Sequence, residues 1–174
     1  MRVRRATAAD AEAFVRVLAT VAEEGRWIGT EGGFDVAERT ARERATIEAG
    51  EERWLLEDDD GRVVGNLGLH PTHARGVYSV GMSIVASARG RGGGRLLMDT
   101  VLRHLATTDA HKLELEVWPD NGRAISLYVS YGFEVEGLRR DHYRRRDGSL
   151  RSSLIMARPL RPAGERQSRP GSGT

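Results

Sequence analysis

The sequence predicts a single α+β domain with three layers, in which helices cover both faces of one twisted, mostly antiparallel mixed sheet. The chain has 174 residues, enough for one domain with a proper core and too few for two. Strand and helix patterns follow one another in the order βααβββαβαββ, which is about seven strands and four helices. No internal repeat interrupts this order.

Capping and glycine signals delimit the elements of the N-terminal part. Residues 2–6 are expected to form a short strand. Thr7 and Asp10 have capping-box spacing before a helix with apolar residues at helical intervals. Residues 25–34 contain four glycines that end this helix, and a more polar helix is expected from about Asp35 to Glu48.

Turn signals and alternation define the rest of the sheet. Two apolar runs around Asp60-Gly61 predict a hairpin, and residues 76–85 continue as another strand. A helix then starts within the stretch SARGRGGGRLLMDTVL. The remaining elements are a strand in KLELEVW, a helix in NGRAISLYVSYG, and two strands around the turn RDGS.

The composition excludes several classes of protein. Hydrophobic residues make up 39% of the chain and charged residues 30%, as in ordinary soluble domains. No apolar run approaches the 18 residues of a membrane span, and the N-terminus lacks the apolar core of a signal peptide, so we expect a cytoplasmic protein without membrane contact. The absence of cysteine excludes disulfides, thiolate metal sites and a cysteine acyl-enzyme.

The sequence pI of about 9.4 does not by itself indicate nucleic-acid binding. Residues 161–174 carry three arginines against one glutamate, which accounts for the net charge of +2. This tail is rich in Pro, Gly, Ser and Arg and is expected to be disordered, so the domain is assigned to residues 1–160. Further arginines, at positions 139, 140 and 144–146, are expected on a solvated strand or hairpin face rather than in a nucleic-acid site.

The glycines of residues 90–94 stand between a strand and a helix. Bare backbone there lets several N–H groups approach a ligand closely, and the helix dipole favours an anion at the same place. Arg89, Arg91 and Arg95 can add charge-assisted hydrogen bonds to phosphate. A flexible connection is the alternative explanation for the glycines. The stretch is neither a Walker loop nor a Rossmann fingerprint.

Two motifs carry a resemblance to a known family. Residues 89–94, Arg-Gly-Arg-Gly-Gly-Gly, resemble the Arg/Gln-x-x-Gly-x-Gly/Ala signature of the GCN5-related N-acetyltransferases (GNAT family). Residues 115–137 resemble the later family motif, in which Leu-Glu-Val, an Asn, Ala-x-x-Leu-Tyr and Gly-Phe follow in order. The resemblance extends over residues 2–160 by element order and is specific over residues 80–137. It implies the GNAT fold, and the pattern is closest to amino-acid N-acyltransferase and ribosomal-protein N-acetyltransferase-like branches.

The resemblance also implies a set of residues that bind acetyl-CoA as cosubstrate. The strand segment implied to pair with the pantetheine arm and acetyl group is Met82, Ser83 and Ile84, and the pyrophosphate loop is Arg89, Gly90, Arg91, Gly92, Gly93, Gly94 and Arg95. Asn121 is implied to contact the cofactor, and an N-cap role is the alternative that does not exclude it. The family usually has a bulky aliphatic residue at the position of Gly93, so the first helical turn is expected to be loose without ligand.

Tyr128 and Glu116 are the expected catalytic residues. The resemblance makes Tyr128 the proton donor to the departing CoA thiolate, against an ordinary core role for a helix tyrosine. Alternation in KLELEVW puts Glu114 and Glu116 on the face opposite the apolar residues. The resemblance makes Glu116 the general base, and a salt-bridged strand glutamate is the alternative. Glu31 and Asp35 are reserve candidates for the base.

The implied reaction is direct attack of an amine on acetyl-CoA, with strand amides stabilising the tetrahedral intermediate. We expect a small amine metabolite, such as an amino acid, as acceptor, with a peptide N-terminus second and a non-catalytic acyl-CoA sensor as the alternative of another class. An acceptor pocket is expected to include Trp27, Glu31 and Phe34. A hydrophobic cover for the core is the alternative role of Trp27, Ile28 and Phe34. No metal is expected, since the histidines at 70 and 73 lack a third ligand of obvious spacing. No nucleic-acid partner is expected, and a homodimer is a candidate assembly.

Overall fold

The structure is a computed structural model that describes residues 1–160, and its elements follow the predicted order. The tail predicted for residues 161–174 lies outside the described residues. The strands are β1 (Arg2–Arg5), β2 (Arg53–Glu57), β3 (Val63–Pro71), β4 (Val77–Ile84), β5 (Lys112–Val117), β6 (Glu134–Arg144) and β7 (Leu150–Pro159). The helices are α1 (Ala11–Glu23), α2 (Val36–Glu48), α3 (Gly93–Leu105) and α4 (Gly122–Ser130).

The seven strands form one sheet in the order β1-β2-β3-β4-β5-β7-β6, which confirms the predicted mostly antiparallel mixed sheet. All neighbours are antiparallel except β4 and β5. This parallel pair is joined only where Val77–Ser79 meet Lys112–Glu114. Beyond Ser79 the two strands part, because β4 stays paired with β3 and β5 stays paired with β7.

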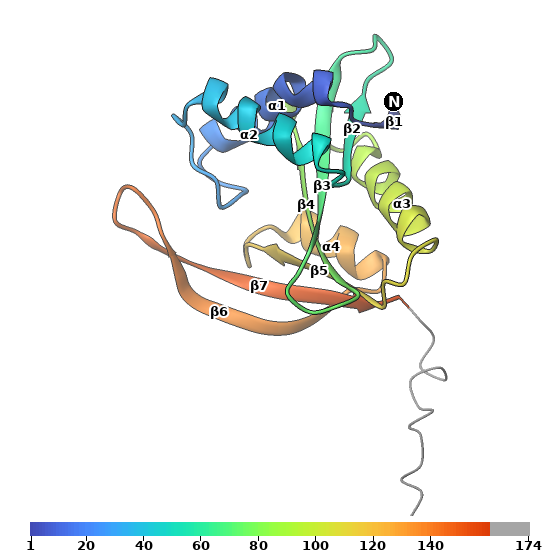
Figure 1. Cartoon of the computed structure of the whole chain (residues 1–174). Coiled ribbons are helices and arrows are strands. Elements are labelled where there is room, and N and C mark those ends of the chain that lie inside the picture. Colours follow the sequence, from blue (N-terminus) through green and yellow to red (C-terminus); the bar gives the residue numbers. More distant parts are fainter. Residues whose placement is uncertain (161–174) are drawn as a thin grey trace, which may run out of the picture.

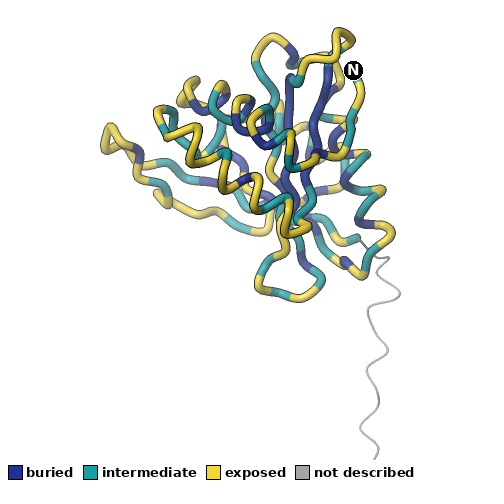
Figure 2. Tube along the Cα trace, turned by 45° about the horizontal axis from the view of Figure 1, so that its top comes forward, coloured by how far each residue is buried: buried dark blue, intermediate teal, exposed yellow. Residues whose placement is uncertain are grey.

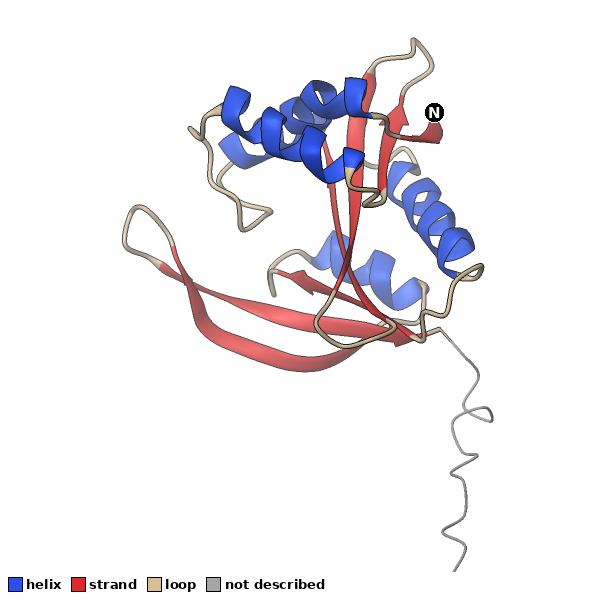
Figure 3. Ribbon diagram, viewed as in Figure 1, coloured by secondary structure: helices blue, strands red, loops and turns tan. Residues whose placement is uncertain are grey.

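Helices cover both faces of the sheet, as predicted. Figure 1 shows α1 and α2 on one side of β3 and β4 and α3 on the other, and the ribbon view in Figure 3 shows the same arrangement. Helix α4 packs on the α3 side, since apolar residues of both helices belong to one cluster with β5. The two faces are called below the α1/α2 face and the α3/α4 face.

The core lies mainly on the α3/α4 face of the sheet. Its fully buried members include Leu97 and Met98 of α3, Leu113 and Leu115 of β5, and Met156 of β7. Figure 2 shows that burial is concentrated in the central strands, whereas the outer surfaces of the helices and β6 are exposed. Burial of apolar surface at about 25 cal/mol per Å² is the main stabilising contribution of such a core.

Local sequence signals form the turns as predicted. The backbone N–H of Thr7 donates to the Asp10 carboxylate at 2.8 Å, and Gly61 has a φ of +78° in the β2–β3 turn. Asp35 caps α2 by accepting a hydrogen bond from the backbone N–H of Glu38 at 2.9 Å. Among residues 1–160, no helix has both the length and the apolar character needed to cross a membrane.

The expected solvated arginine face of the last hairpin is present at Arg139, Arg140, Arg144 and Arg146, which are exposed, and Arg145 is the exception. Arg145 is only 8% exposed and donates to the carbonyl oxygens of Gly29 at 2.8 Å and Ile28 at 3.4 Å. Arg146 donates to the carbonyl of Gly32 at 2.7 Å. The segment between α1 and α2 is neither helix nor strand, so its carbonyl groups need other donors, and the hairpin arginines supply them.

Candidate functional site

A cleft opens where β4 and β5 part. It has a volume of about 970 Å³ and is lined by residues of both faces of the sheet, so it passes from the α3/α4 face to the α1/α2 face. Thirteen predicted site residues line it: Trp27, Met82, Ser83, Ile84, Arg89, Gly90, Gly92, Gly93, Gly94, Arg95, Glu116, Asn121 and Tyr128. The predicted residues Arg91, Glu31 and Phe34 do not line it.

The wall formed by β4 offers free backbone groups. The N–H of Val85 donates to the carbonyl of Val64 in the β3 direction at 3.0 Å. Because successive residues of a strand point their backbone groups to opposite edges, Val80, Met82 and Ile84 turn theirs toward the gap. Ser83 differs from the prediction in this respect, since its backbone groups point to β3 and only its side chain faces the cleft.

The glycine loop at one end of the cleft leads into the N-terminus of α3. Gly90 and Gly92 have φ values of +78° and +86°, a left-handed conformation that glycine adopts without strain. Gly92 is the N-cap of α3 and provides no capping side chain. The first N–H groups of the helix, together with its dipole, therefore form a site suited to an anion.

Not all of the loop arginines are available to a ligand. Arg89 donates to the carbonyl of Ile84 at 2.8 Å and makes a two-bond ion pair with Glu24, at 2.6 and 2.7 Å. Arg91 lies 3.5 Å from Asp59, outside the cleft. Arg95 lines the cleft without a carboxylate partner among residues 1–160.

Arg123 in the first turn of α4 was missed by the sequence analysis. It lines the cleft beside the glycine loop, with its Nη1 3.9 Å from the position of a Cβ on Gly90. Arg123 follows the DNG turn in the sequence, two residues after the capping asparagine. Only the packing of α4 against α3 brings it to the glycine loop.

The missing side chain at Gly93 has a packing explanation. A Cβ at this position would lie 2.5 Å from Cδ2 of Leu56, a distance that real contacts essentially never show. Leu56 of β2 thus fills the space of the aliphatic residue expected here, and Gly93 itself is buried. The first turn of α3 is close-packed where the sequence alone indicated a loose one.

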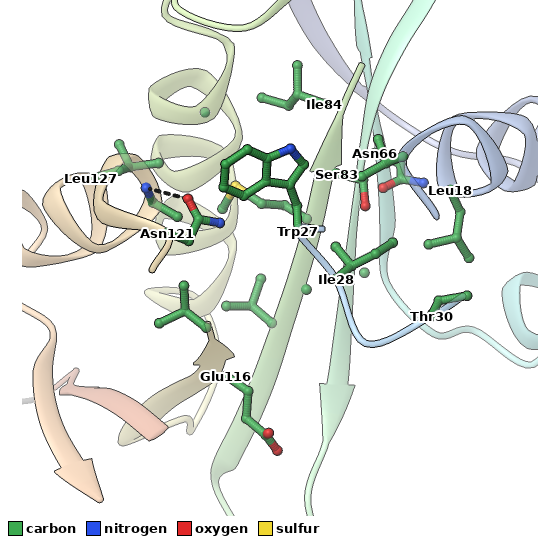
Figure 4. Close-up of a pocket in the computed structure, with 18 of the residues that line it drawn as sticks. Leu18, Trp27, Ile28, Thr30, Asn66, Ser83, Ile84, Glu116, Asn121 and Leu127 are labelled. Atoms are coloured by element: carbon green, nitrogen blue, oxygen red, sulfur yellow. Dashed lines mark hydrogen bonds between the residues drawn. The ribbon is translucent and has the colours of Figure 1, made fainter. Parts of the chain in front are cut away.

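Asn121 has the N-cap role and also faces the cleft. Its Oδ1 accepts a hydrogen bond from the N–H of Ala124 at 3.2 Å. Figure 4 shows this bond as a dashed line and shows the Asn121 amide nitrogen on the side toward Trp27. The cap therefore orients the amide so that its N–H₂ group is presented to the cleft.

Glu116 stands on the α1/α2 side and is held by three donors. Arg139 donates to Oε1 at 2.5 Å, and the hydroxyls of Tyr143 and Ser153 donate to Oε2, each at 2.8 Å. A carboxylate has about four acceptor positions, so one remains, on Oε1. The carboxylate is oriented by these contacts and keeps a third of its side-chain surface exposed. The predicted salt-bridge role is thus present, and a free acceptor position remains beside it.

Tyr128 is buried in the core while its ring lines the cleft. It is 8% exposed and packs against Phe133 with ring centroids 5.8 Å apart. Burial raises the pKa of its hydroxyl to about 12, so the phenol is protonated at neutral pH. The hydroxyl has no hydrogen-bond partner among residues 1–160, and it remains available as a donor.

The segment between α1 and α2 contributes only part of the predicted acceptor pocket. Trp27 and Ile28 line the cleft. Glu31 instead lies 3.4 Å from Arg145 Nε and accepts from the N–H of Arg146 at 3.1 Å. Asp35 is occupied as the cap of α2. Both reserve bases are therefore engaged in structural contacts away from the cleft.

Asn66 on β3 is a second cleft residue that the sequence analysis missed. It is 3% exposed, and its Nδ2 donates to the carbonyl of Phe14 in α1 at 2.8 Å. An available signal was the position of this amide in the otherwise apolar strand VVGNLGL. A buried polar residue in such a strand needs a specific partner or a ligand.

Comparison with known proteins agrees with this geometry. The sequence model of the Acetyltransferase (GNAT) family matches residues 12–133. The chain is 39% identical over 70 residues to the [ribosomal protein bS18]-alanine N-acetyltransferase of Salmonella typhimurium, covering 40% of this chain and 47% of that protein. It is 32% identical over 127 residues to the mycothiol acetyltransferase of Beutenbergia cavernae, covering 66% of this chain and 42% of that protein. The chain thus spans about half the length of these relatives.

Solved structures share the fold. A ribosomal-protein-alanine N-acetyltransferase from Brucella melitensis superposes with a TM-score of 0.80 at 24% identity, covering 91% of this chain and 99% of that one. A phosphinothricin acetyltransferase from Sinorhizobium meliloti in complex with AcCoA gives a TM-score of 0.79 at 21% identity, covering 91% of this chain and 87% of that one. In these proteins the same arrangement of sheet and helices recurs over nearly the whole domain.

Proposed function

Since the chain belongs to the Acetyltransferase (GNAT) family, we propose that it transfers the acetyl group of acetyl-CoA to the amine of a small metabolite, such as an amino acid or an amino-acid analogue. The observation that carries this proposal is the cleft between β4 and β5. It joins an anion site at the start of α3 to an oriented carboxylate, Glu116, along a free strand edge.

The residues along the cleft suit each part of acetyl-CoA. The N–H groups around Gly93, with Arg95 and Arg123, would hold the pyrophosphate. The backbone groups of Met82 and the N–H of Ile84 would pair with the amides of the pantetheine arm, as an added strand does, while the Ile84 carbonyl accepts from Arg89. In this assignment Arg89 is not a phosphate ligand, because its guanidinium is paired with Glu24 and holds the loop to the end of α1.

The chemistry needs a free amine, a stabilised oxyanion and a protonated thiol. The amine nitrogen forms a bond to the thioester carbon, and backbone N–H groups of the β4 edge would stabilise the negative oxygen. The free acceptor position of Glu116 would take the amine proton, directly or through a water. When the carbon–sulfur bond breaks, the Tyr128 hydroxyl would protonate the thiolate, a role for which its raised pKa keeps it protonated.

The acceptor half of the cleft supports a small acceptor. The Trp27–Thr30 segment crosses above β4 and β3 in Figure 4, and Arg145 fixes its carbonyl groups. Trp27, Ile28 and Thr30 thus line the acceptor half of the cleft opposite the sheet, which favours an acceptor small enough to lie between them. A peptide N-terminus is the second candidate, supported by the relatives named as acetyltransferases of the alanine of a ribosomal protein.

The test is release of CoA from acetyl-CoA with amino acids, polyamines and short peptides as acceptors, for the wild type and for Tyr128→Phe. We expect turnover on free amino acids or related amines and a fall in kcat of about 10²-fold or more in Tyr128→Phe. Turnover on peptides alone would replace the proposed acceptor class with the second candidate. Binding of acetyl-CoA without turnover on any acceptor would indicate a sensor instead.

A further inference from the structure

The α1/α2 side of the cleft has a gap in its floor at Gly81. Gly68 of β3 and Gly81 of β4 are register partners, and alternation places both on this face. Gly81 is exposed although β4 is a central strand, and a Cβ on it would meet no atom within 4 Å. Gly81 thus leaves a trough in the middle of the sheet. The space over Gly68 is filled by the side chains of Arg53 and His70, whose atoms lie 3.0–3.4 Å from the position of a Cβ there.

Two buried polar side chains stand at one end of this trough. Asn66 and Ser83 are the next register partners on the same face, 3% and 7% exposed. The carbonyl of Phe14 can only accept, so the Asn66 amide must turn its N–H₂ group to Phe14 and its Oδ1 away from it. Figure 4 shows the oxygens of Asn66 and Ser83 close to each other at the cleft.

Neither oxygen has a hydrogen-bond partner within residues 1–160. An oxygen this buried is costly to leave unpaired when a ligand closes the site over it. The orientation imposed by Phe14 makes the Asn66 oxygen an acceptor only. Together with the Ser83 hydroxyl, it selects for a ligand group that donates.

The roof of the trough is apolar and fixed in place. Ile28 and Trp27 cover it from the segment between α1 and α2, and Leu18 of α1 closes one side (Figure 4). The bonds from Arg145 to the carbonyls of Ile28 and Gly29 hold this roof above the floor. A slim ligand would therefore lie between this roof and the bare backbone at Gly81, beside the Arg53 and His70 side chains over Gly68, with its donor group at Asn66 and Ser83.

We propose that Asn66 and Ser83 are specificity-determining residues that bind a second hydrogen-bond donor of the acceptor, a hydroxyl, an amide N–H₂ or a second ammonium, in addition to the amine that is acetylated. This inference rests on the proposed function. An acceptor without such a donor leaves the Asn66 oxygen unpaired, so the trough discriminates between molecules of equal shape.

Isosteric pairs of acceptors provide the test. Threonine is compared with valine, and 1,4-diaminobutane with pentylamine, by kcat/KM in the full-length protein. We expect the donor-bearing member of a pair to be favoured about tenfold or more. Ser83→Ala should abolish most of this preference without changing the KM for acetyl-CoA or the Tm, because the hydroxyl makes no internal hydrogen bond. A wild type without preference, or a preference untouched by Ser83→Ala, overturns the proposal.

A second variant tests the trough itself. Gly81→Val would fill the floor with a residue that favours strands, and Gly137→Val is the matched control, since a Cβ on Gly137 also meets nothing within 4 Å and lies on the edge strand β6. We expect Gly81→Val to weaken acceptor binding at least tenfold and to retain acetyl-CoA binding. Equal acceptor binding by the two variants would overturn the assignment of the trough.

The same pairs distinguish failure of this inference from failure of the proposed function. If no acceptor turns over, their binding to the wild type and to Ser83→Ala is measured by nuclear magnetic resonance titration. Preferential binding of threonine over valine that is lost in Ser83→Ala would support the inference in a non-catalytic protein. Binding of neither member at millimolar concentration would overturn it.

Discussion

Replacement of Arg145 by Met should loosen the roof of the proposed acceptor site while leaving the hairpin intact. The side chain is 7% exposed, and its guanidinium contacts the carbonyls of Ile28 and Gly29 and the carboxylate of Glu31. Methionine keeps much of the apolar length and removes the donors. The backbone bonds of Arg145 to Ser149 and Gly148, which form the hairpin turn, do not depend on the side chain.

The size of the effect follows from the bonds that are lost. Hydrogen bonds to a charged group contribute about 1.5–3 kcal/mol each, and leaving a buried partner unpaired costs about 1–3 kcal/mol. Water can reach part of this segment, since the Glu31 side chain is 27% exposed, and this offsets some of the loss. We expect a decrease of about 2–3 kcal/mol in the free energy of unfolding. At about 2–4 °C per kcal/mol for a domain of this size, Tm would fall by about 4–12 °C.

The assay combines thermal unfolding with steady-state kinetics. The KM for the acceptor should rise about tenfold, while the KM for acetyl-CoA should stay within about twofold, because the roof covers only the acceptor half. Arg144→Met is the control, since the neighbouring arginine is exposed and has no side-chain partner among residues 1–160. If the two variants have the same Tm and the same acceptor KM, the reasoning about the roof is refuted.

Three further predictions concern other contacts. Glu24→Gln removes the carboxylate that neutralises Arg89 of the glycine loop. The KM for acetyl-CoA at low salt should therefore fall about two- to fivefold. An unchanged or higher KM would contradict this prediction. Arg4 donates to Glu57 and to Asp10, and these hydrogen bonds are the largest cause of the lowered pKa of each carboxyl. Both pairs therefore stabilise the fold above the unfolded pKa values and lose their effect as the pH falls through the lowered ones. Arg4→Met should reduce Tm more at pH 7 than at pH 3, and a Tm loss independent of pH would argue against the pairs. Gly93→Ala should lower the free energy of unfolding by about 1–3 kcal/mol through overpacking, as measured by urea unfolding. Gly122→Ala should leave it unchanged, because a Cβ there meets no atom within 4 Å. Equal free energies of unfolding for the two variants would rule out the packing explanation.

Short-range signals in the sequence were sufficient for the elements and for the motifs that carry the family. The Asp60-Gly61 turn and the Asn121 cap depend on residues within four positions of each other, so their geometry is encoded locally. The glycines of the loop likewise indicated an anion site at the start of α3. These features explain why the fold class and the element order were predicted correctly.

The roles of individual side chains were decided by partners distant in the chain. Arg145 meets the carbonyl of Gly29 across 116 positions, Arg89 meets Glu24 across 65, and Asn66 meets Phe14 across 52. No periodicity or spacing reports such a pairing. An arginine can bind a phosphate, pair with a carboxylate or donate to a loop carbonyl. Its role depends on which of these groups the packing of the sheet brings within hydrogen-bond distance, and only the tertiary structure decides this.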